Sequence, residues 1–173
     1  MKNTAKKLRV FDFDGTLVDT NSSVYVMHSD GTETKLSPAE FSSYGHRDGD
    51  DYDFRDFGKL ISPKRRRMMK VFRKMVVDSG GKGVYILTAR DNNAQQAIRS
   101  YLKRVVGELM TNVRVITLGS SDPFAKAIYL REKIAKNNYN DVYFCDDHWS
   151  NVKAVGDVLE NLPQVTKFKL QKV

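Results

Sequence analysis

The chain has 173 residues, of which 40% are hydrophobic, and a formal net charge of +8. A chain of this length buries roughly two-thirds of the surface that its unfolded form exposes, so we expect one hydrophobic core and a single domain over residues 1–173. Its apolar runs are far shorter than the roughly 20 residues that cross a bilayer, and residues 1–7 are too polar for a secretion signal. The composition therefore predicts a cytoplasmic protein, and the single cysteine, Cys145, fits a reducing compartment.

The positive charge predicts a surface that attracts anions such as nucleotides, nucleic acid or phosphorylated metabolites. Much of this charge lies in residues 64–74, where Met68 and Phe72 begin a series of apolar residues at helical spacing. We expect an amphipathic helix there, with a basic outer face. That face is either a solvated surface or a binding surface for nucleic acid or phosphate, and charge alone does not decide between them.

The first predicted element is a buried strand over residues 8–13, because an apolar and β-branched run ends there in the turn sequence Asp14-Gly15-Thr16. Two short strand-like runs then flank Ser29-Asp30-Gly31, which is a hairpin signal. Residues 37–62 are polar and lack sustained periodicity, so we expect an irregular insertion that forms a small lid. Residues 20–62 are thus predicted to be a flap hairpin and a small cap insertion within the domain.

From Pro63 onwards, predicted helices alternate with predicted strands. The helices are expected over residues 63–78, 92–106, 122–136 and 149–158, and the strands over 83–87, 113–118, 141–145 and 165–170. This alternation predicts an α/β fold, a Rossmann-like three-layer sandwich with a mainly parallel sheet. In such sheets, ligands bind beyond the carboxyl ends of the strands.

Polar side chains of several types are predicted to meet at that edge of the sheet. They are Asp12 and Asp14 after the first strand, Thr88 after the second regular strand, Asp146 and Asp147 before the last helix, and Lys126 near the start of the helix that Asp122 opens. Each residue alone has an ordinary structural explanation as a turn, cap or surface residue. Their joint occurrence at strand and helix ends predicts a site for phosphoryl transfer.

Each of these residue types can perform a step that phosphoryl transfer requires. Carboxylates from two strands, Asp12 and Asp146, can hold a hard cation such as magnesium. A carboxylate can also attack phosphorus, which divides one difficult displacement into two easier ones. Asp14, two residues from Asp12, is positioned as a general acid for the leaving oxygen. The Thr88 hydroxyl and the Lys126 ammonium would bind the equatorial oxygens of the transferred phosphoryl group.

Four segments in this order resemble the motifs of the haloacid dehalogenase (HAD) superfamily. They are Phe11-Asp-Phe-Asp-Gly-Thr-Leu-Val18, Ile86-Leu-Thr-Ala-Arg90, Lys126, and Phe144-Cys-Asp-Asp147. The resemblance implies a Rossmann-like sheet, Mg²⁺ as cofactor, Asp12 as nucleophile and Asp14 as acid/base. It also implies that Thr88 and Lys126 contact phosphate, and that the metal-binding residues are Asp12, Asp14, Asp146 and Asp147.

The presence of Asp14 favours a phosphatase, because the dehalogenase and phosphonatase branches of this superfamily lack that residue. The chain is also similar to short phosphatases of the superfamily found in phage genomes, which would place it in the host cytoplasm. Candidate substrate contacts are Gly15, Thr16, Arg90 and His148, although His148 is better explained as a loop residue. Lys133 competes with Lys126 for the role of phosphate-binding lysine, and Lys126 is favoured because it lies near the start of its helix, where the helix dipole also favours phosphate.

The expected function is therefore hydrolysis of a phosphomonoester through an aspartyl phosphate. We expect a nucleotide or a phosphorylated nucleic-acid end as substrate, then a sugar phosphate, then a phosphoprotein; only net charge and the small lid support this order. The main alternative is a catalytically silent protein of the same fold that binds nucleic acid through helix 64–74. The acidic residues oppose it, because clustered carboxylates repel a polyanion unless a cation neutralises them.

A two-component receiver domain also combines acidic residues, a threonine and a lysine. Here, however, the acidic pair follows the lysine instead of preceding it, so this class is disfavoured. A nucleotide kinase is disfavoured too, because residues 80–83 lack the spacing of a phosphate-binding loop. No membrane partner is expected, and the sequence does not indicate an oligomeric state.

Overall fold

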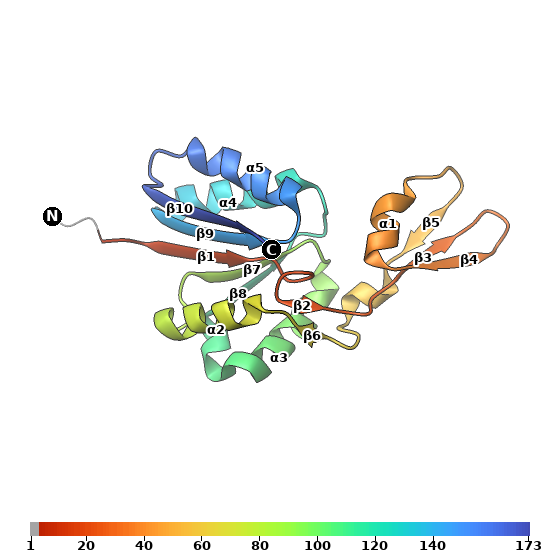
Figure 1. Cartoon of the computed structure of the whole chain (residues 1–173), viewed down its shortest axis with the longest axis horizontal. Coiled ribbons are helices and arrows are strands. Elements are labelled where there is room, and N and C mark those ends of the chain that lie inside the picture. Colours follow the sequence, from red (N-terminus) through yellow and green to blue (C-terminus); the bar gives the residue numbers. More distant parts are fainter. Residues whose placement is uncertain (1–3) are drawn as a thin grey trace.

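The computed structural model describes residues 4–173. The prediction for residues 1–7 thus falls partly outside the described residues. The centre of the fold is a sheet of five parallel strands in the order β10-β9-β1-β7-β8 (Figure 1). These strands are β1 (Lys7–Phe11), β7 (Val84–Thr88), β8 (Arg114–Thr117), β9 (Asp141–Asp146) and β10 (Lys167–Lys172). The predicted α/β fold with a mainly parallel sheet is confirmed.

Two pairs of helices cover the two faces of this sheet (Figure 1). The helices α2 (Met68–Ser79) and α3 (Gln95–Val106) cover one face, and α4 (Pro123–Asn137) and α5 (Trp149–Glu160) cover the other. Alternate residues of β1 point to opposite faces, so Leu8 and Val10 pack under α4 and α5 while Phe11 packs under α2 and α3. Within the described residues, no helix is both long and apolar enough to cross a membrane.

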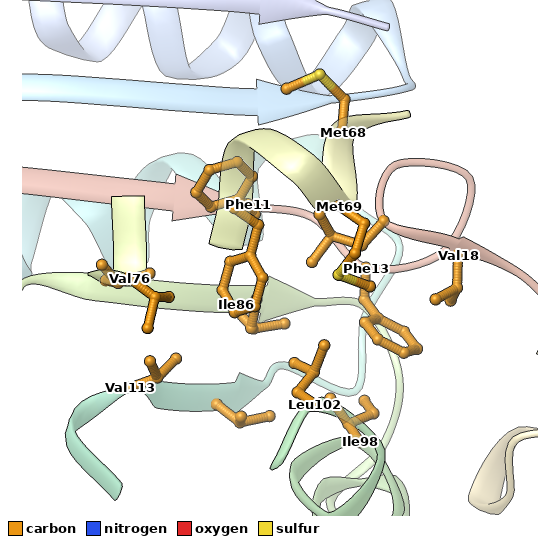
Figure 2. Close-up of a cluster of buried hydrophobic side chains, with 14 of the residues drawn as sticks. Phe11, Phe13, Val18, Met68, Met69, Val76, Ile86, Ile98, Leu102 and Val113 are labelled. Carbon is orange, nitrogen blue, oxygen red and sulfur yellow. The ribbon is translucent and has the colours of Figure 1, made fainter. Parts of the chain in front are cut away.

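The larger hydrophobic cluster extends past the end of β1 and supports the loop that follows it. Figure 2 shows Phe11 and Phe13 surrounded by side chains of α2, α3 and the neighbouring strands. Phe13 is fully buried and its ring meets Tyr101 of α3 edge-on, with the ring centroids 6.5 Å apart. Phe11 makes a similar contact with Phe72 of α2 at 5.5 Å. Asp12 is thus held between two anchored aromatic residues.

A small cap projects from the carboxyl edge of the sheet (Figure 1). Its elements are β3 (Val24–Met27), β4 (Glu33–Leu36), α1 (Pro38–Tyr44), β5 (Asp51–Asp53) and the 3-10 helix η1 (Arg55–Gly58). The strands β3 and β4 form the predicted hairpin, and β5 pairs with β3 on its other side.

The prediction that residues 37–62 are irregular is therefore wrong in part. The helix α1 begins with a capping box, in which the Ser37 hydroxyl accepts from the Glu40 amide and the Glu40 carboxylate accepts from the Ser37 amide. This helix has only 7 residues, which is too short for sustained periodicity to appear in the sequence.

The helix expected from Pro63 begins later, at Met68. The residues before it form a short strand, β6 (Lys64–Arg65), which pairs antiparallel with β2 (Val18–Asp19). The Arg66 amide continues this connection by donating to the Leu17 carbonyl at 2.9 Å. Helical propensity at 63–67 is thus overridden by backbone pairing with a segment far away in the sequence.

Candidate active site

The loop after β1 holds Asp12 at the carboxyl edge of the sheet. The Asp12 amide donates to the Cys145 carbonyl of β9 at 2.9 Å, which keeps Asp12 in register with the strands. Beyond it the chain turns sharply, and Gly15 adopts a φ of 72° that favours glycine. A Cβ atom at Gly15 would also overlap with the Asp147 carboxylate. Only glycine allows this loop to pack against the end of β9.

Lys126 lies between two of the carboxylates predicted for the site. Its Nζ donates to Asp12 Oδ1 at 2.8 Å and to Asp146 Oδ2 at 2.7 Å, and all three side chains are at least nine-tenths buried. Burial alone would lower the pKa of Lys126, but the attraction of Asp12 and Asp146 outweighs it and leaves the pKa raised. Lys133, the competing lysine, instead lies over the rings of Tyr85 and Tyr129.

The two aspartates at the end of β9 have different surroundings. Asp146 is fully buried and accepts hydrogen bonds from the His148 amide at 2.8 Å and from Asn151 Nδ2 at 3.1 Å. The Oδ1 atom of Asp147 is buried and has no hydrogen-bond partner among the described residues. A buried carboxylate oxygen without a partner is costly, so this atom needs a ligand that the described protein groups do not supply.

Asp12, Asp146 and Asp147 form a group that could hold a cation. One ligand atom from each lies within 4.8 Å of those of the other two. Burial raises the pKa of Asp12 well above its ordinary value, the Lys126 ammonium opposes this shift, and the carboxylates of Asp146 and Asp147 add to it. One lysine therefore does not neutralise the repulsion among three carboxylates. An oxygen-seeking divalent cation fits this donor set and would satisfy the free oxygen of Asp147.

Asp14 lies outside this acidic group, because its carboxylate is bound by Arg90. The Nε and Nη2 atoms of Arg90 each donate to one oxygen of Asp14 at 2.8 Å. Its Nη1 donates to the carbonyls of Phe57 at 2.8 Å and Lys59 at 2.7 Å, so the same guanidinium ties the cap to the sheet edge. The side chain of Arg90 is only 2% exposed, whereas that of Asp14 is 36% exposed.

These contacts bear on two expectations from the sequence. The Asp14 carboxylate is bound by Arg90 and is not one of the three carboxylates, Asp12, Asp146 and Asp147, that form the acidic group. All three guanidinium nitrogens of the buried Arg90 are bonded to protein groups, so its predicted contact with substrate stays a prediction. The sequence carries no signal for this arrangement, because the partners of Arg90 lie 31 to 76 residues away along the chain.

The remaining predicted residues lie around the acidic group. Thr16 is buried and its hydroxyl donates to Asp12 Oδ2 at 2.9 Å, so in this arrangement it contacts Asp12 directly. Thr88 ends β7, the strand next to β1, and its hydroxyl accepts from the Arg90 amide at 3.2 Å. His148 lies at the rim with its side chain 65% exposed, 3.7 Å from an Asp147 oxygen.

Sequence reasoning missed Asp56 in the cap. This aspartate is 8% exposed and accepts from the Ser23 amide at 3.0 Å and the Tyr25 hydroxyl at 3.1 Å. It fixes η1 next to β3, and the carbonyl of the following Phe57 is one of the acceptors of Arg90. Asp56 belongs to a run of aspartates in residues 48–56, and no sequence pattern distinguishes it from Asp48 and Asp51, which are exposed.

One solved structure is similar over nearly the whole chain. It is the HAD domain of the effector protein Lem4 from Legionella pneumophila, in an inactive mutant form, with a TM-score of 0.52 and 15% identity. The match covers 98% of this chain and 86% of that chain. The sequence matches no protein-family model and no curated protein. The structural likeness shows a HAD-like α/β fold, and the carboxyl edge of its sheet carries an acidic group suited to a metal ion.

Proposed function

We propose that this protein is a magnesium-dependent phosphomonoester hydrolase in which Asp12 is the nucleophile. The observation that carries the proposal is the position of the Asp12 carboxylate, which is buried among Lys126, Thr16 and two further carboxylates and precedes Asp14 by two residues. Asp12, Asp146 and Asp147 would hold the cation. When bound, Mg²⁺ would supply positive charge that offsets the repulsion between these carboxylates and an anionic phosphate.

In the first step, an Asp12 carboxylate oxygen attacks phosphorus and the bond from phosphorus to the leaving oxygen breaks. Asp14 gives a proton to the leaving oxygen, and the product is an aspartyl phosphate. In the second step, water attacks the phosphorus, Asp14 takes a proton from that water, and the bond from phosphorus to Asp12 breaks to release inorganic phosphate.

The other residues support these steps. Lys126 stabilises the ionised form of Asp12 against its burial and provides positive charge near the phosphoryl oxygens. Arg90 fixes the orientation of Asp14 with one hydrogen bond to each oxygen. A carboxylate oxygen has two lone pairs, so each oxygen of Asp14 retains acceptor capacity for proton transfer.

For the substrate, we propose a nucleotide or a phosphorylated nucleic-acid end. The net charge of +8 and the small cap support an anionic substrate that can be bulky. A sugar phosphate is the second candidate. A catalytically silent nucleic-acid-binding protein is the alternative from another class, and the three clustered carboxylates argue against it.

The direct test is hydrolysis of a generic aryl phosphate by the purified protein. We expect activity that requires Mg²⁺, disappears in excess chelator and returns when the metal is restored. The variant Asp12→Asn should be inactive, whereas Asp51→Asn, which removes an exposed carboxylate of the cap, should retain full activity. Full activity of Asp12→Asn, or activity that survives chelation, would refute the mechanism.

A further inference from the structure

A cavity of about 690 Å³ opens beside the candidate active site. Thr16 is one of its lining residues, and the same threonine donates its hydroxyl to Asp12. The cavity therefore borders a residue that contacts the proposed nucleophile. Three consecutive arginines, Arg65 to Arg67, also line it, together with the apolar side chains of Met68 and Val71. We call this cavity the arginine pocket.

Backbone hydrogen bonds hold the segment that contains the three arginines, while two of the three guanidinium groups have no ion-pair partner among residues 4–173. Arg65 belongs to β6 and pairs with Val18, and the Arg66 amide donates to the Leu17 carbonyl. Arg66 forms an exposed ion pair with Asp19 at 3.0 Å. Neither Arg65 nor Arg67 has an ion-pair partner among residues 4–173, and both side chains are exposed. The pocket thus presents guanidinium groups that are available to an anion.

The positive charge continues from the pocket along α2. A second hollow of about 280 Å³ is lined by Lys70, Arg73 and Lys74. A helix turns once in about 3.6 residues and rises about 1.5 Å per residue. Lys74 therefore follows Lys70 by about one turn on the same side of α2, and Arg67 directly precedes the helix. Lys74 also forms an exposed ion pair with Asp78 at 2.6 Å. The result is a row of cationic groups that begins at the arginine pocket.

We propose that the arginine pocket and this row bind the phosphodiester groups of a single nucleic-acid strand whose terminal phosphate is attacked by Asp12. The inference rests on the proposed function and specifies its substrate. Arginine forks bind phosphate oxygens in pairs, and a row of cations suits a polymer with regularly spaced charges. A free nucleotide or a sugar phosphate would leave most of these cations unused. The apolar lining by Met68 and Val71 offers a surface for a sugar or base.

The test compares substrates across charge variants. Wild-type protein, the double variant R65Q/R67Q and the control K136Q/K153Q are assayed with an aryl phosphate, a nucleoside monophosphate, a phosphorylated single-stranded oligonucleotide and a phosphorylated peptide. The control removes equal charge from exposed positions on α4 and α5, on the opposite face of the sheet. We expect R65Q/R67Q to lose at least about 10-fold more kcat/KM with the oligonucleotide than with the aryl phosphate. The control should show no such selective loss.

A binding measurement distinguishes failure of this inference from failure of the proposed function. In the Asp12→Asn background, anisotropy of a labelled oligonucleotide gives affinity without turnover. Each lost contact to a single strand should reduce the slope of log affinity against log salt by about 0.7, so R65Q/R67Q should reduce it by about 1.4. If this slope changes as expected but the wild-type protein hydrolyses no phosphate, the result would support binding at the arginine pocket and refute the proposed enzymatic activity.

Three results would overturn the inference. The first is an equal loss in R65Q/R67Q and in K136Q/K153Q. The second is a loss in R65Q/R67Q that is the same for all four substrates. The third is hydrolysis of the nucleoside monophosphate or the phosphorylated peptide as efficiently as of the oligonucleotide.

Discussion

The carboxyl edge of the five-stranded sheet and the small sheet of the cap both carry paired charges, but their environments differ. At the sheet edge, Lys126, Asp12 and Asp146 are nearly inaccessible to water. In the cap, Arg55 pairs with Glu33 and Asp53 while each side chain remains 36 to 49% exposed. Buried charges that lose a partner cost far more free energy than exposed ones. Substitutions in the two regions should therefore have very different effects.

The largest effect is expected for Lys126→Met. This change leaves two buried carboxylates without their cation, and we expect it to abolish hydrolysis and to lower the free energy of unfolding by roughly 3–5 kcal/mol. Denaturant unfolding in chelator measures the stability. Lys133→Met, on the same helix but over tyrosine rings, is the matched control and should remain active.

The stability deficit of Lys126→Met should also depend on pH. Burial already raises the pKa of Asp12 above its ordinary 3.8, and loss of the lysine raises it further. A carboxyl with a raised folded pKa favours folding when protonated, so this contribution is present at low pH and is lost as the pH rises through the folded pKa. The deficit should thus be largest at neutral pH and shrink in acid. A deficit that grows in acid would contradict this electrostatic explanation.

Asp14→Asn should slow hydrolysis of a phosphomonoester by roughly 10²-fold or more, because general acid–base catalysis contributes about that factor. Its unfolding free energy should change less than that of Lys126→Met, because asparagine keeps an oxygen that can accept from the buried Arg90 and the guanidinium retains the carbonyls of Phe57 and Lys59. The loss should be smaller for substrates with acidic leaving groups, which need no proton. Equal losses of kcat/KM, which reports the first step, for good and poor leaving groups would remove Asp14 from the role of general acid.

Arg90→Lys should lower kcat by roughly 10-fold. Hydrolysis by this variant should still be slowed further by Asp14→Asn. Lysine keeps the charge, but it cannot bond both oxygens of Asp14 and the carbonyls of Phe57 and Lys59 at once. We expect hydrogen exchange at residues 55–59 to increase in this variant. Unchanged exchange there would show that Arg90 does not hold the cap.

The smallest effect is expected for Arg55→Gln in the cap. Exposed ion pairs contribute little, so the Tm should fall by less than about 2–4 °C and hydrolysis should be unchanged. A loss of activity similar to that of Asp14→Asn would show that the charges of the cap take part in the reaction, and the contrast between the two regions would fail.

The same contrast explains what could be predicted from the sequence. The strands of the sheet are continuous apolar runs that end in polar residues, so the position of Asp12, Thr88 and Asp146 at one edge followed from the pattern. Lys126 was favoured over Lys133 by its place near a helix start, and the structure places Lys126 on Asp12.

The cap and the pairing of Arg90 could not be predicted in this way. Residues 37–62 owe their structure to a short capped helix and to the pairing of β5 with β3, neither of which produces sustained periodicity. Arg90 acquires its role from an aspartate and two backbone carbonyls that only the folded chain brings together. Local sequence patterns indicate buried elements well, and they carry little information on long-range polar contacts.

The most direct test of the central claim is to trap the aspartyl phosphate. Wild-type protein is mixed with Mg²⁺ and an aryl phosphate carrying labelled phosphate, quenched in acid during turnover, and digested for mass spectrometry. We predict a phosphorylated peptide in which the label lies on Asp12, is released by hydroxylamine, and is missing from Asp12→Asn. Turnover without label on Asp12, or with label on another residue, would contradict the assignment of Asp12 as the nucleophile.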